Sequence, residues 1–382
     1  MIVDSLRYSQ YDATPQEWKL EECTFGNINL IVGENASGKS KALNVIGNLG
    51  DLLSGDRGLF LAANYEITFN RDGQNISYIL RCERSAILEE KLDIGSETFL
   101  TRGADGIGKI YYEKLSDTVD FQAPPNQVVS ITRRDAIQHP FLEDLYLWGK
   151  AVRRYRFGSD LGKSHLLVPL KAKEGESEQH LNAKNTNMVV GMFIEGKKAF
   201  SNEFTDSIRQ DMGAIGYELL EIGAAPPVSI VFEPAPGEVL GLYVNEADLN
   251  GMTDQNDMSQ GMFRALSLII QVTYSQFTNA PSCILIDDIG EGLDYNRSTA
   301  LVKLLVEKAK ESPVQLIMAT NDRFVMNSVP LEYWSVMQRI GNTSRIYNCR
   351  NSPNLFKEFE LTGLNNFDFF SSKYYLKDDR QN

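Results

Sequence analysis

The sequence predicts an α/β fold built around a phosphate-binding loop. Residues 29–32 form an apolar run that leads into Gly33 and Gly38-Lys39-Ser40, which fit the pattern G-x-x-x-x-G-K-[ST]. A helical pattern follows the loop directly. Far along the chain, a second apolar run ends in the paired carboxylates Asp287-Asp288. A buried strand, a glycine-containing loop, a helix and a strand that ends in acids are the parts that a P-loop nucleotide site requires.

The loop chemistry explains why these residue types occur at this spacing. Small residues allow successive backbone N–H groups to turn toward a phosphate, and the following helix directs its positive end at the same anion. Lys39 is predicted to reach the β- and γ-phosphates, and the Ser40 hydroxyl to coordinate Mg²⁺. The predicted nucleotide contacts on this loop are Asn35, Ala36, Ser37, Gly38, Lys39, Ser40 and Lys41.

Composition limits the other classes of function. The chain has 382 residues, 42% of them hydrophobic and 23% charged, which is ordinary for a globular protein. No run of 18 apolar residues and no signal sequence occur, and the four cysteines are scattered, so a reduced, cytoplasmic location without membrane attachment is expected. The three histidines form no metal-spaced cluster. A net charge of −13 argues against broad nucleic-acid binding but allows a local basic patch.

The order of predicted elements supports this fold class. Strands are expected at residues 2–8, 18–22 and 28–32, and the helix after the loop should end near Leu53, before a glycine-containing turn. Alternating segments from about residue 60 to 122 predict an antiparallel meander. The segments expected further along are a strand at 128–132, a helix at 141–157, an exposed, mobile loop at 158–186, mainly helix at 187–222 ending near Gly223, and strands at 228–232, 240–244 and 314–319.

These elements suggest three regions. The expected division is a nucleotide-binding core at 1–135 and 226–350, a helical lid inserted at 136–225, and a C-terminal tail at 351–382.

The second half of the predicted site follows the apolar strand at 282–286. Asp287 is predicted to join Ser40 on Mg²⁺, and Asp288 to act as the general base for an attacking water. Ser259-Gln260-Gly261 precedes a helical run, where a hydroxyl and backbone N–H groups can hold an anion. Asn321 follows the strand at 314–319, at the edge of the sheet where ligands bind in α/β folds.

These pieces, in this order, resemble an ABC-type ATPase. Residues 33–40 resemble Walker A, Ser259-Gln260-Gly261 the signature motif, residues 284–288 Walker B, and Leu293-Asp294 the D-loop, with Asn321 at the switch position. Lys39 and Asp287 are 248 residues apart, which is similar to the RecF/SMC/OLD branch. Within that branch the chain resembles stand-alone ATPases of bacterial antiviral systems such as Septu and certain retrons, through residues 320–327 and 363–368.

The sequence departs from the family pattern at three positions. Asp288 stands in place of the usual glutamate, which predicts slow turnover. Asn321 stands in place of the usual histidine and can hydrogen-bond a γ-phosphate, although it cannot carry a proton near neutral pH. The signature begins Met258-Ser259-Gln260-Gly261. The Q-loop glutamine has two weak candidates, Gln127 and Gln138.

The resemblance implies a P-loop ABC-ATPase head with an antiparallel β meander and a helical lid. It also implies ATP and Mg²⁺ as ligands and a head-to-tail homodimer, or a higher oligomer, that closes around ATP. Since the chain shows no second catalytic constellation, the expected role is control of a separate effector, a nuclease or toxin encoded nearby, in anti-phage defence.

The alternative is a RecF/SMC-like ATPase that clamps DNA. It rests on Arg133-Arg134 and the basic stretch at 150–156. The non-functional interpretation of these residues is that they form surface ion pairs. A transporter cassette is disfavoured, because the long insertion leaves little that resembles a surface for coupling to membrane helices.

Overall fold

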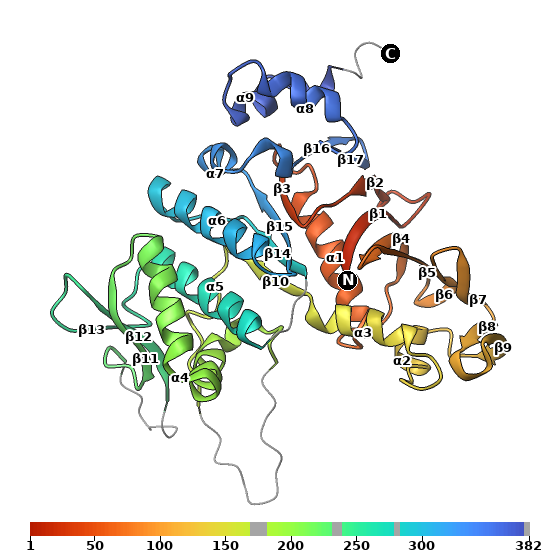
Figure 1. Cartoon of the computed structure of the whole chain (residues 1–382), viewed down its shortest axis with the longest axis horizontal. Helices are drawn as coiled ribbons and strands as arrows, with labels where there is room; N and C mark the ends of the chain where they lie inside the picture. Colours follow the sequence, from red (N-terminus) through yellow and green to blue (C-terminus); the bar gives the residue numbers. More distant parts are fainter. Residues whose placement is uncertain (169–181, 231–238, 279–282, 378–382) are drawn as a thin grey trace, which may run out of the picture. The chain divides into compact units, whose positions relative to one another are not determined.

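The computed structural model describes residues 1–168, 182–230, 239–278 and 283–377. It divides into two compact units (Figure 1). The first unit contains residues 1–153, 282–285 and 313–382, and the second contains residues 154–281 and 286–312.

A large mixed sheet forms the first unit. Its central strand, β3 (Ile28–Gly33), is buried along its whole length and lies between β15 (Gln315–Thr320) and β16 (Trp334–Ile340), both parallel to it. From β14 onward, the strand order is β14-β15-β3-β16-β17-β2-β1-β4-β5-β6-β7-β8-β9. The bounds of the other strands are β1 (Ile2–Gln10), β2 (Trp18–Thr24), β4 (Ala62–Arg71), β5 (Gln74–Glu83), β6 (Ala86–Ile94), β7 (Glu97–Gly103), β8 (Ile107–Tyr112), β9 (Asp117–Gln122), β14 (Cys283–Asp287) and β17 (Thr343–Asn348).

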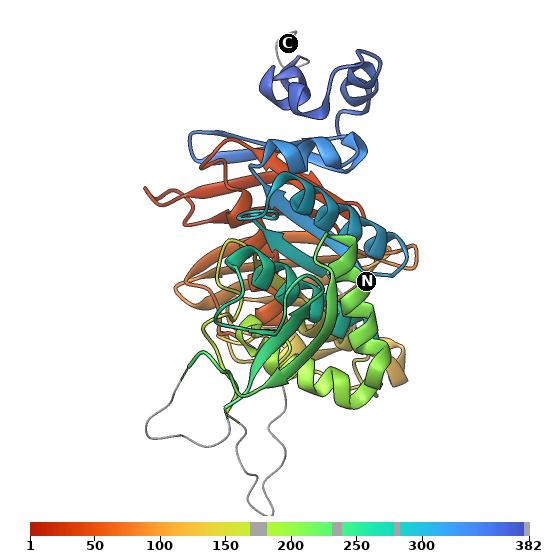
Figure 2. The same cartoon turned by 90° about the vertical axis from the view of Figure 1, so that its left-hand side faces the viewer.

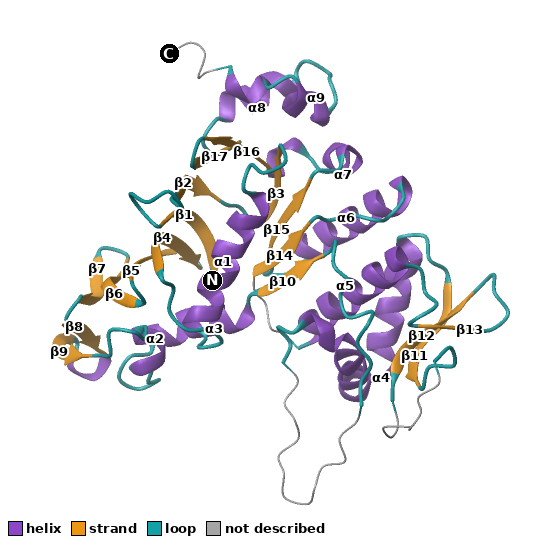
Figure 3. Ribbon diagram, turned by 180° about the vertical axis from the view of Figure 1, so that it is seen from behind, coloured by secondary structure: helices purple, strands orange, loops and turns teal. Residues whose placement is uncertain are grey.

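One face of this sheet carries the core of the first unit. Burial alternates along the antiparallel strands, as in β4, so that every second side chain faces inward. Helix α1 (Lys39–Leu53) runs beside β3 and β15, and α3 (Phe141–Ala151) packs against α1 (Figure 3). Gly149 of α3 permits this contact, because a Cβ there would lie 2.5 Å from the Gly50 carbonyl oxygen of α1.

The chain after β15 stays in the first unit. Helix α7 (Arg323–Ser328) and the short η3 (Leu331–Tyr333) lead into β16 and β17. Helix α8 (Pro353–Glu360), helix α9 (Asn366–Ser371) and η4 (Tyr374–Leu376) then form a C-terminal tail, residues 353–377. Figures 1 and 2 both show this tail beyond β16 and β17, at the C-terminal end of the chain.

The second unit is mainly helical. Helix α4 (Val189–Ala214), preceded by η2 (Thr186–Met188) and broken at Ser201, packs against α5 (Gln260–Phe277) and contacts α6 (Tyr295–Lys310). A small sheet joins β11 (Leu219–Ala225), β12 (Gly241–Glu246) and β13 (Met252–Asp254), all antiparallel. The short strand β10 (Arg153–Arg156) opens the unit.

Most predicted strands and helices are confirmed, including the first three strands, the helix that ends at Leu53, the meander and the strand at 240–244. The predicted strand at 128–132 is wrong: this segment is helix α2 (Val129–Thr132). The Glu90 carboxylate accepts the Val129 N–H at 3.1 Å, and Arg102 binds the carbonyl of Gln127, so a buried ion pair from the meander holds the helix start.

Two predicted helices end early. The helix expected at 141–157 stops at Ala151, where Arg153 Nη1 donates to the carbonyls of Lys150 and Val152. The helix expected to reach Gly223 stops at Ala214, because Gly216 takes a left-handed conformation at φ 85° and β11 follows.

Two further predictions lie partly outside the described residues. The first is the loop predicted at 158–186, whose central residues 169–181 are outside the described part. Near the start of this loop, Leu161 is buried. In the predicted strand at 228–232, the N–H groups of Val228 and Ser229 bind the Asp254 carboxylate, and residues 231 and 232 are outside the described part.

Candidate functional site

The phosphate loop, residues 33–40, begins where β3 ends. Met337 of β16 pairs with Gly33, and Thr320 of β15 pairs with Val32, so the loop leaves the sheet between two parallel neighbours. Its backbone turns through left-handed conformations at Ala36 (φ 62°) and Gly38 (φ 109°). Such alternation directs consecutive N–H groups into one concavity, which is how backbone loops bind anions.

Lys39 lies buried against this loop. Its Nζ donates to the carbonyl oxygens of Gly33 at 2.9 Å and Glu34 at 3.1 Å. The ammonium group therefore sits at the loop, where a phosphate would provide stronger, charged acceptors than the two carbonyls.

Two observations test whether this loop fits a phosphate. Among the described residues, the buried Ser37 Oγ has no hydrogen-bond partner. The N-cap of α1, Gly38, offers no side-chain cap, and the first turn of this 15-residue helix holds no acidic residue. A buried hydroxyl and a helix N-terminus without a capping side chain both favour an anion, so the loop fits the group that its sequence implies.

Two cations from different segments flank the loop. Arg339, near the end of β16, places Nη1 3.5 Å from the Ala36 carbonyl oxygen, and Lys41 Nζ lies 4.3 Å from the centre of the Trp18 ring. Partial burial, and next the charge of Arg339, lower the pKa of Lys41. Nothing in the sequence pattern marked Arg339, because it lies about 300 residues from the loop.

Asn321 follows the end of β15 and is exposed. The next residue, Asp322, caps α7 by accepting hydrogen bonds from the N–H groups of Phe324 and Val325. Since β15 pairs with β3 up to Thr320, Asn321 belongs to the same sheet edge as the start of the phosphate loop.

The other predicted residues lie in the second unit. Asp287 is the last residue of β14, and Asp288 follows it. The chain then turns tightly, and we call residues 287–294 the acidic turn. The Phe157 N–H donates to the Asp287 carbonyl at 2.9 Å. Asp288 adopts a left-handed backbone at φ 54°, a strained conformation for a residue other than glycine that is concentrated at functional sites.

The signature turn, residues 259–261, begins α5. Ser259 is confirmed as the residue before the helix, and its Oγ accepts the Met262 N–H at 3.2 Å. Gly261 packs closely on the acidic turn, since a Cβ there would lie 2.7 Å from the Gly292 carbonyl oxygen. Gln260 is exposed beside it.

One arginine joins these two turns, and sequence analysis assigned it no role. Arg264, one helical turn beyond the signature turn, donates to three carbonyl oxygens: Ser159 through Nε at 2.7 Å, Gly158 through Nη2 at 2.5 Å and Glu291 through Nη1 at 3.1 Å. Its side chain is largely buried. The guanidinium thus fixes α5 to the acidic turn and to the loop after β10.

The predicted site residues thus form two groups, and the members of each group lie in the same unit. The phosphate loop and Asn321 belong to the first unit, and the signature and acidic turns belong to the second. Three of the basic residues that favour a DNA clamp are engaged within the first unit: Arg134 pairs with Glu143 and Lys150 with Asp56, while Arg153 is buried against backbone carbonyls.

Comparison with known proteins shows the fold. No family model and no curated protein matches the sequence. A solved SMC head bound to the C-winged helix domain of ScpA superposes with a TM-score of 0.53 and 14% identity, covering 91% of this chain and 97% of that one. A second, an SMC head domain with an extended coiled coil bound to the C-terminal domain of ScpA, from Pyrococcus furiosus, gives a TM-score of 0.51 and 13% identity over 94% and 99%.

The chain has the fold of an SMC head domain. Across the described ranges, no helix is both long and apolar enough for a membrane span, and no three His, Cys, Asp or Glu side chains group as metal ligands would.

Proposed function

We propose that this protein binds and hydrolyses ATP with Mg²⁺ and works as a switch. The observation that carries the proposal is the phosphate loop itself: Lys39 bonded to its carbonyls, the buried Ser37 hydroxyl without a hydrogen-bond partner in the described part of the chain, and a helix N-terminus without a capping side chain. The SMC head fold supports it, and so does the sequence resemblance.

In this proposal each residue has one task. Lys39 and the loop N–H groups bind the phosphates, and Ser40 with Asp287 would hold Mg²⁺, which supplies charge neutralisation on the transferred phosphoryl group. Asp288 takes a proton from the attacking water, and Asn321 orients the γ-phosphate end by hydrogen bonding. The left-handed backbone of Asp288 supports a functional role at that position.

We also propose that two copies close head to tail around two ATP molecules. The signature turn of one copy would then cover the phosphate loop of the other, with Ser259, Gln260 and Gly261 as contacts in trans. Differential contacts with the γ-phosphate would favour the closed dimer, and hydrolysis would remove them.

The finer proposal is that this switch controls an effector, a nuclease or toxin encoded nearby, in bacterial anti-phage defence. Its support is the sequence resemblance to defence ATPases. The two solved SMC heads described above are also bound to a domain of another protein. Co-purification of the full chain with the products of neighbouring genes tests this part separately.

The test of the central proposal uses a fluorescent ATP analogue and Mg²⁺. The wild-type chain should bind with micromolar affinity, and Lys39→Ala should lower that affinity by roughly 100-fold, because the loop loses its buried cation. Light scattering should show that Asp288→Asn doubles in mass with Mg-ATP, since slow hydrolysis preserves the closed state. If the wild-type chain and Lys39→Ala both leave Mg-ATP unbound, the proposal is wrong.

A further inference from the structure

The C-terminal tail has a small aromatic core of its own. Phe369 contacts Phe356 and Phe359, with ring centres 4.7 and 5.0 Å apart, and all three side chains are buried. Tyr374 packs on Phe359 at 5.1 Å. Helices α8 and α9 and η4 are therefore joined into one piece that can move as a body.

This piece touches two elements of the nucleotide site. Lys373 Nζ lies 3.1 Å from Oε1 of Glu34, which is the second residue of the phosphate loop. The Phe367 N–H donates to Asn327 Oδ1 at 2.8 Å, within α7, the helix that begins two residues after Asn321. The side-chain amide of Asn366 adds a bond to the Val329 carbonyl, also at 2.8 Å.

The backbone of the tail is strained where it meets the loop. Lys373 has φ 56° and ψ 37°, a left-handed conformation that is unfavourable for a residue with a Cβ. The charge of Glu34 also acts on the nearby Tyr375. Burial is the larger cause that raises the pKa of the Tyr375 hydroxyl, and the Glu34 charge raises it further. Both residues place tail groups around one carboxylate of the phosphate loop.

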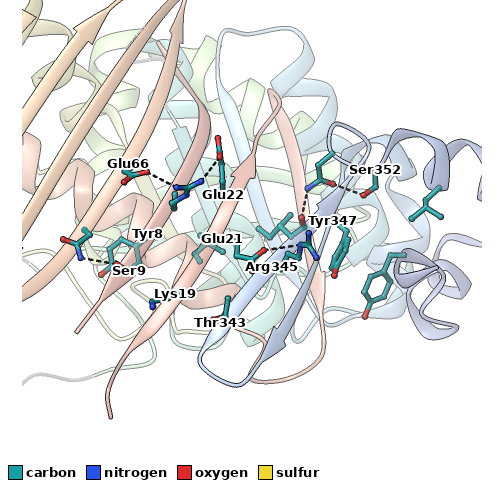
Figure 4. A pocket seen from close by; sticks show the side chains of 17 residues that line it. Tyr8, Ser9, Lys19, Glu21, Glu22, Glu66, Thr343, Arg345, Tyr347 and Ser352 are labelled. Carbon is teal, nitrogen blue, oxygen red and sulfur yellow. Dashed lines mark hydrogen bonds and ion pairs between the residues drawn. The ribbon is translucent and has the colours of Figure 1, made fainter. Parts of the chain in front are cut away.

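Beside this contact the tail does not pack fully onto the sheet. A pocket of about 820 Å³ is lined by Leu355 and Tyr375 of the tail and by Arg345 and Tyr347 of β17 (Figure 4). The Tyr347 and Tyr375 rings, 5.4 Å apart, border it. The tail is therefore packed less closely against this part of the sheet than a core element would be.

We propose that the tail is a latch on the phosphate loop, and that Lys373 exchanges Glu34 for the phosphates of a bound nucleoside triphosphate. This inference rests on the proposed function. The Lys373 and Glu34 side chains are 49% and 67% exposed, and an ion pair so exposed is weak and is weakened further by salt. A polyphosphate bound at the same loop competes with one carboxylate for the ammonium group. The position of the tail then reports whether nucleotide is bound.

Hydrogen exchange of the full chain tests the latch, with and without a non-hydrolysable ATP analogue and Mg²⁺. In the wild-type protein, nucleotide should change the exchange rates of amides in residues 353–377 by roughly threefold or more, on the scale of a weak ion pair. Lys373→Glu should exchange fast in both states and lose about fivefold in analogue affinity. The matched control is Lys357→Glu in α8, an exposed lysine on the same tail for which the described residues provide no ion pair. It should behave as wild type.

The outcomes separate the latch from the ATPase proposal. If the wild-type chain binds the analogue but Lys373→Glu and Lys357→Glu behave alike, the latch is wrong and the ATPase proposal stands. If the wild-type chain does not bind it, both fall. The double variant Glu34→Lys/Lys373→Glu adds a further check, because it should restore slow tail exchange in the absence of nucleotide; fast exchange there counts against the ion pair as the tie.

Discussion

The phosphate loop of the first unit is shaped by backbone, whereas the signature turn of the second unit is held by one side chain. At the phosphate loop, Gly33 lies so close to β16 that a Cβ would be 2.5 Å from the Met337 carbonyl oxygen. At the signature turn, Arg264 connects α5 to three carbonyls of two loops. The phosphate loop therefore requires a residue without a side chain at position 33, and the signature turn requires the guanidinium group of Arg264.

This difference indicates different tolerances. The phosphate loop is fixed by strand pairing and close backbone approach, so it should keep its shape in the monomer. The signature turn is fixed by the Arg264 guanidinium, so its position should change when the loops that provide the acceptor carbonyls move. In the proposed cycle, the phosphate loop would bind the nucleotide, and the signature turn would respond to that binding.

The largest expected effect comes from filling the space at Gly33. Gly33→Val places a branched side chain against the Met337 backbone and Ser37 Oγ, so we expect analogue affinity to fall by roughly 100-fold or more. The control is Gly26→Ala in the turn before β3, where the nearest atoms to a Cβ are 3.7 Å away. Titration of both variants, with circular dichroism to confirm folding, checks the result. Equal affinities would show that close backbone approach does not shape this site.

An intermediate effect is expected when Arg264 is replaced. Arg264→Met leaves three carbonyls without their charged donor, and we expect the free energy of unfolding to fall by about 2 kcal/mol, a moderate loss because two of those residues are exposed and water can reach them. Nucleotide affinity of the monomer should stay within about twofold, while ATP-dependent dimerisation is lost. Thermal unfolding and light scattering measure the two effects.

Arg209→Met is the control for this replacement, since the contacts of Arg209 with the Asp206 carboxylate and the Leu220 carbonyl are both exposed. Arg264→Lys should recover part of the stability lost in Arg264→Met, but a lysine cannot form all three hydrogen bonds. A loss of monomer affinity in Arg264→Met as large as that in Gly33→Val would remove the distinction between the two regions.

The same contrast explains what could be predicted from the sequence. Helix α1 was predicted through Leu53 because its start and stop signals are local, a glycine at its N-cap and a glycine-containing turn after it. The meander was predicted because its alternation is local. The helix start after Ser259 was predicted for the same reason.

The failures come from contacts between residues far apart in the chain. Helix α2 depends on Glu90, about 40 residues earlier, which no local pattern reveals. The early end of α3 is an exception, because Arg153, which was counted as part of the helix, binds the carbonyl of Lys150 only three residues away. In the candidate site, the roles of Arg264, Arg339 and Lys373 follow from partners about 30 to 340 residues away. Spacing identifies the phosphate loop, but it does not identify what fixes the loop's surroundings.

The smallest expected effect sharpens the comparison within the first region. If backbone shapes the phosphate loop, the cations beside it should contribute only long-range attraction. Arg339→Ala should then lower analogue affinity by about threefold, and Lys41→Ala by about the same, since neither forms an ion pair with a carboxylate among the described residues and both lie near solvent.

Salt dependence distinguishes such attraction from direct recognition. Losses caused by long-range attraction should disappear at about 1 M salt, where the screening length is near 3 Å. The matched control is Arg345→Ala on the neighbouring strand β17, whose guanidinium pairs with Glu21 and should leave affinity unchanged. A loss at Arg339 that exceeds about 30-fold and persists in high salt would mean direct hydrogen bonding to the nucleotide. In that case side chains as well as backbone would define the phosphate loop, and the two regions would differ less than their apo geometry indicates.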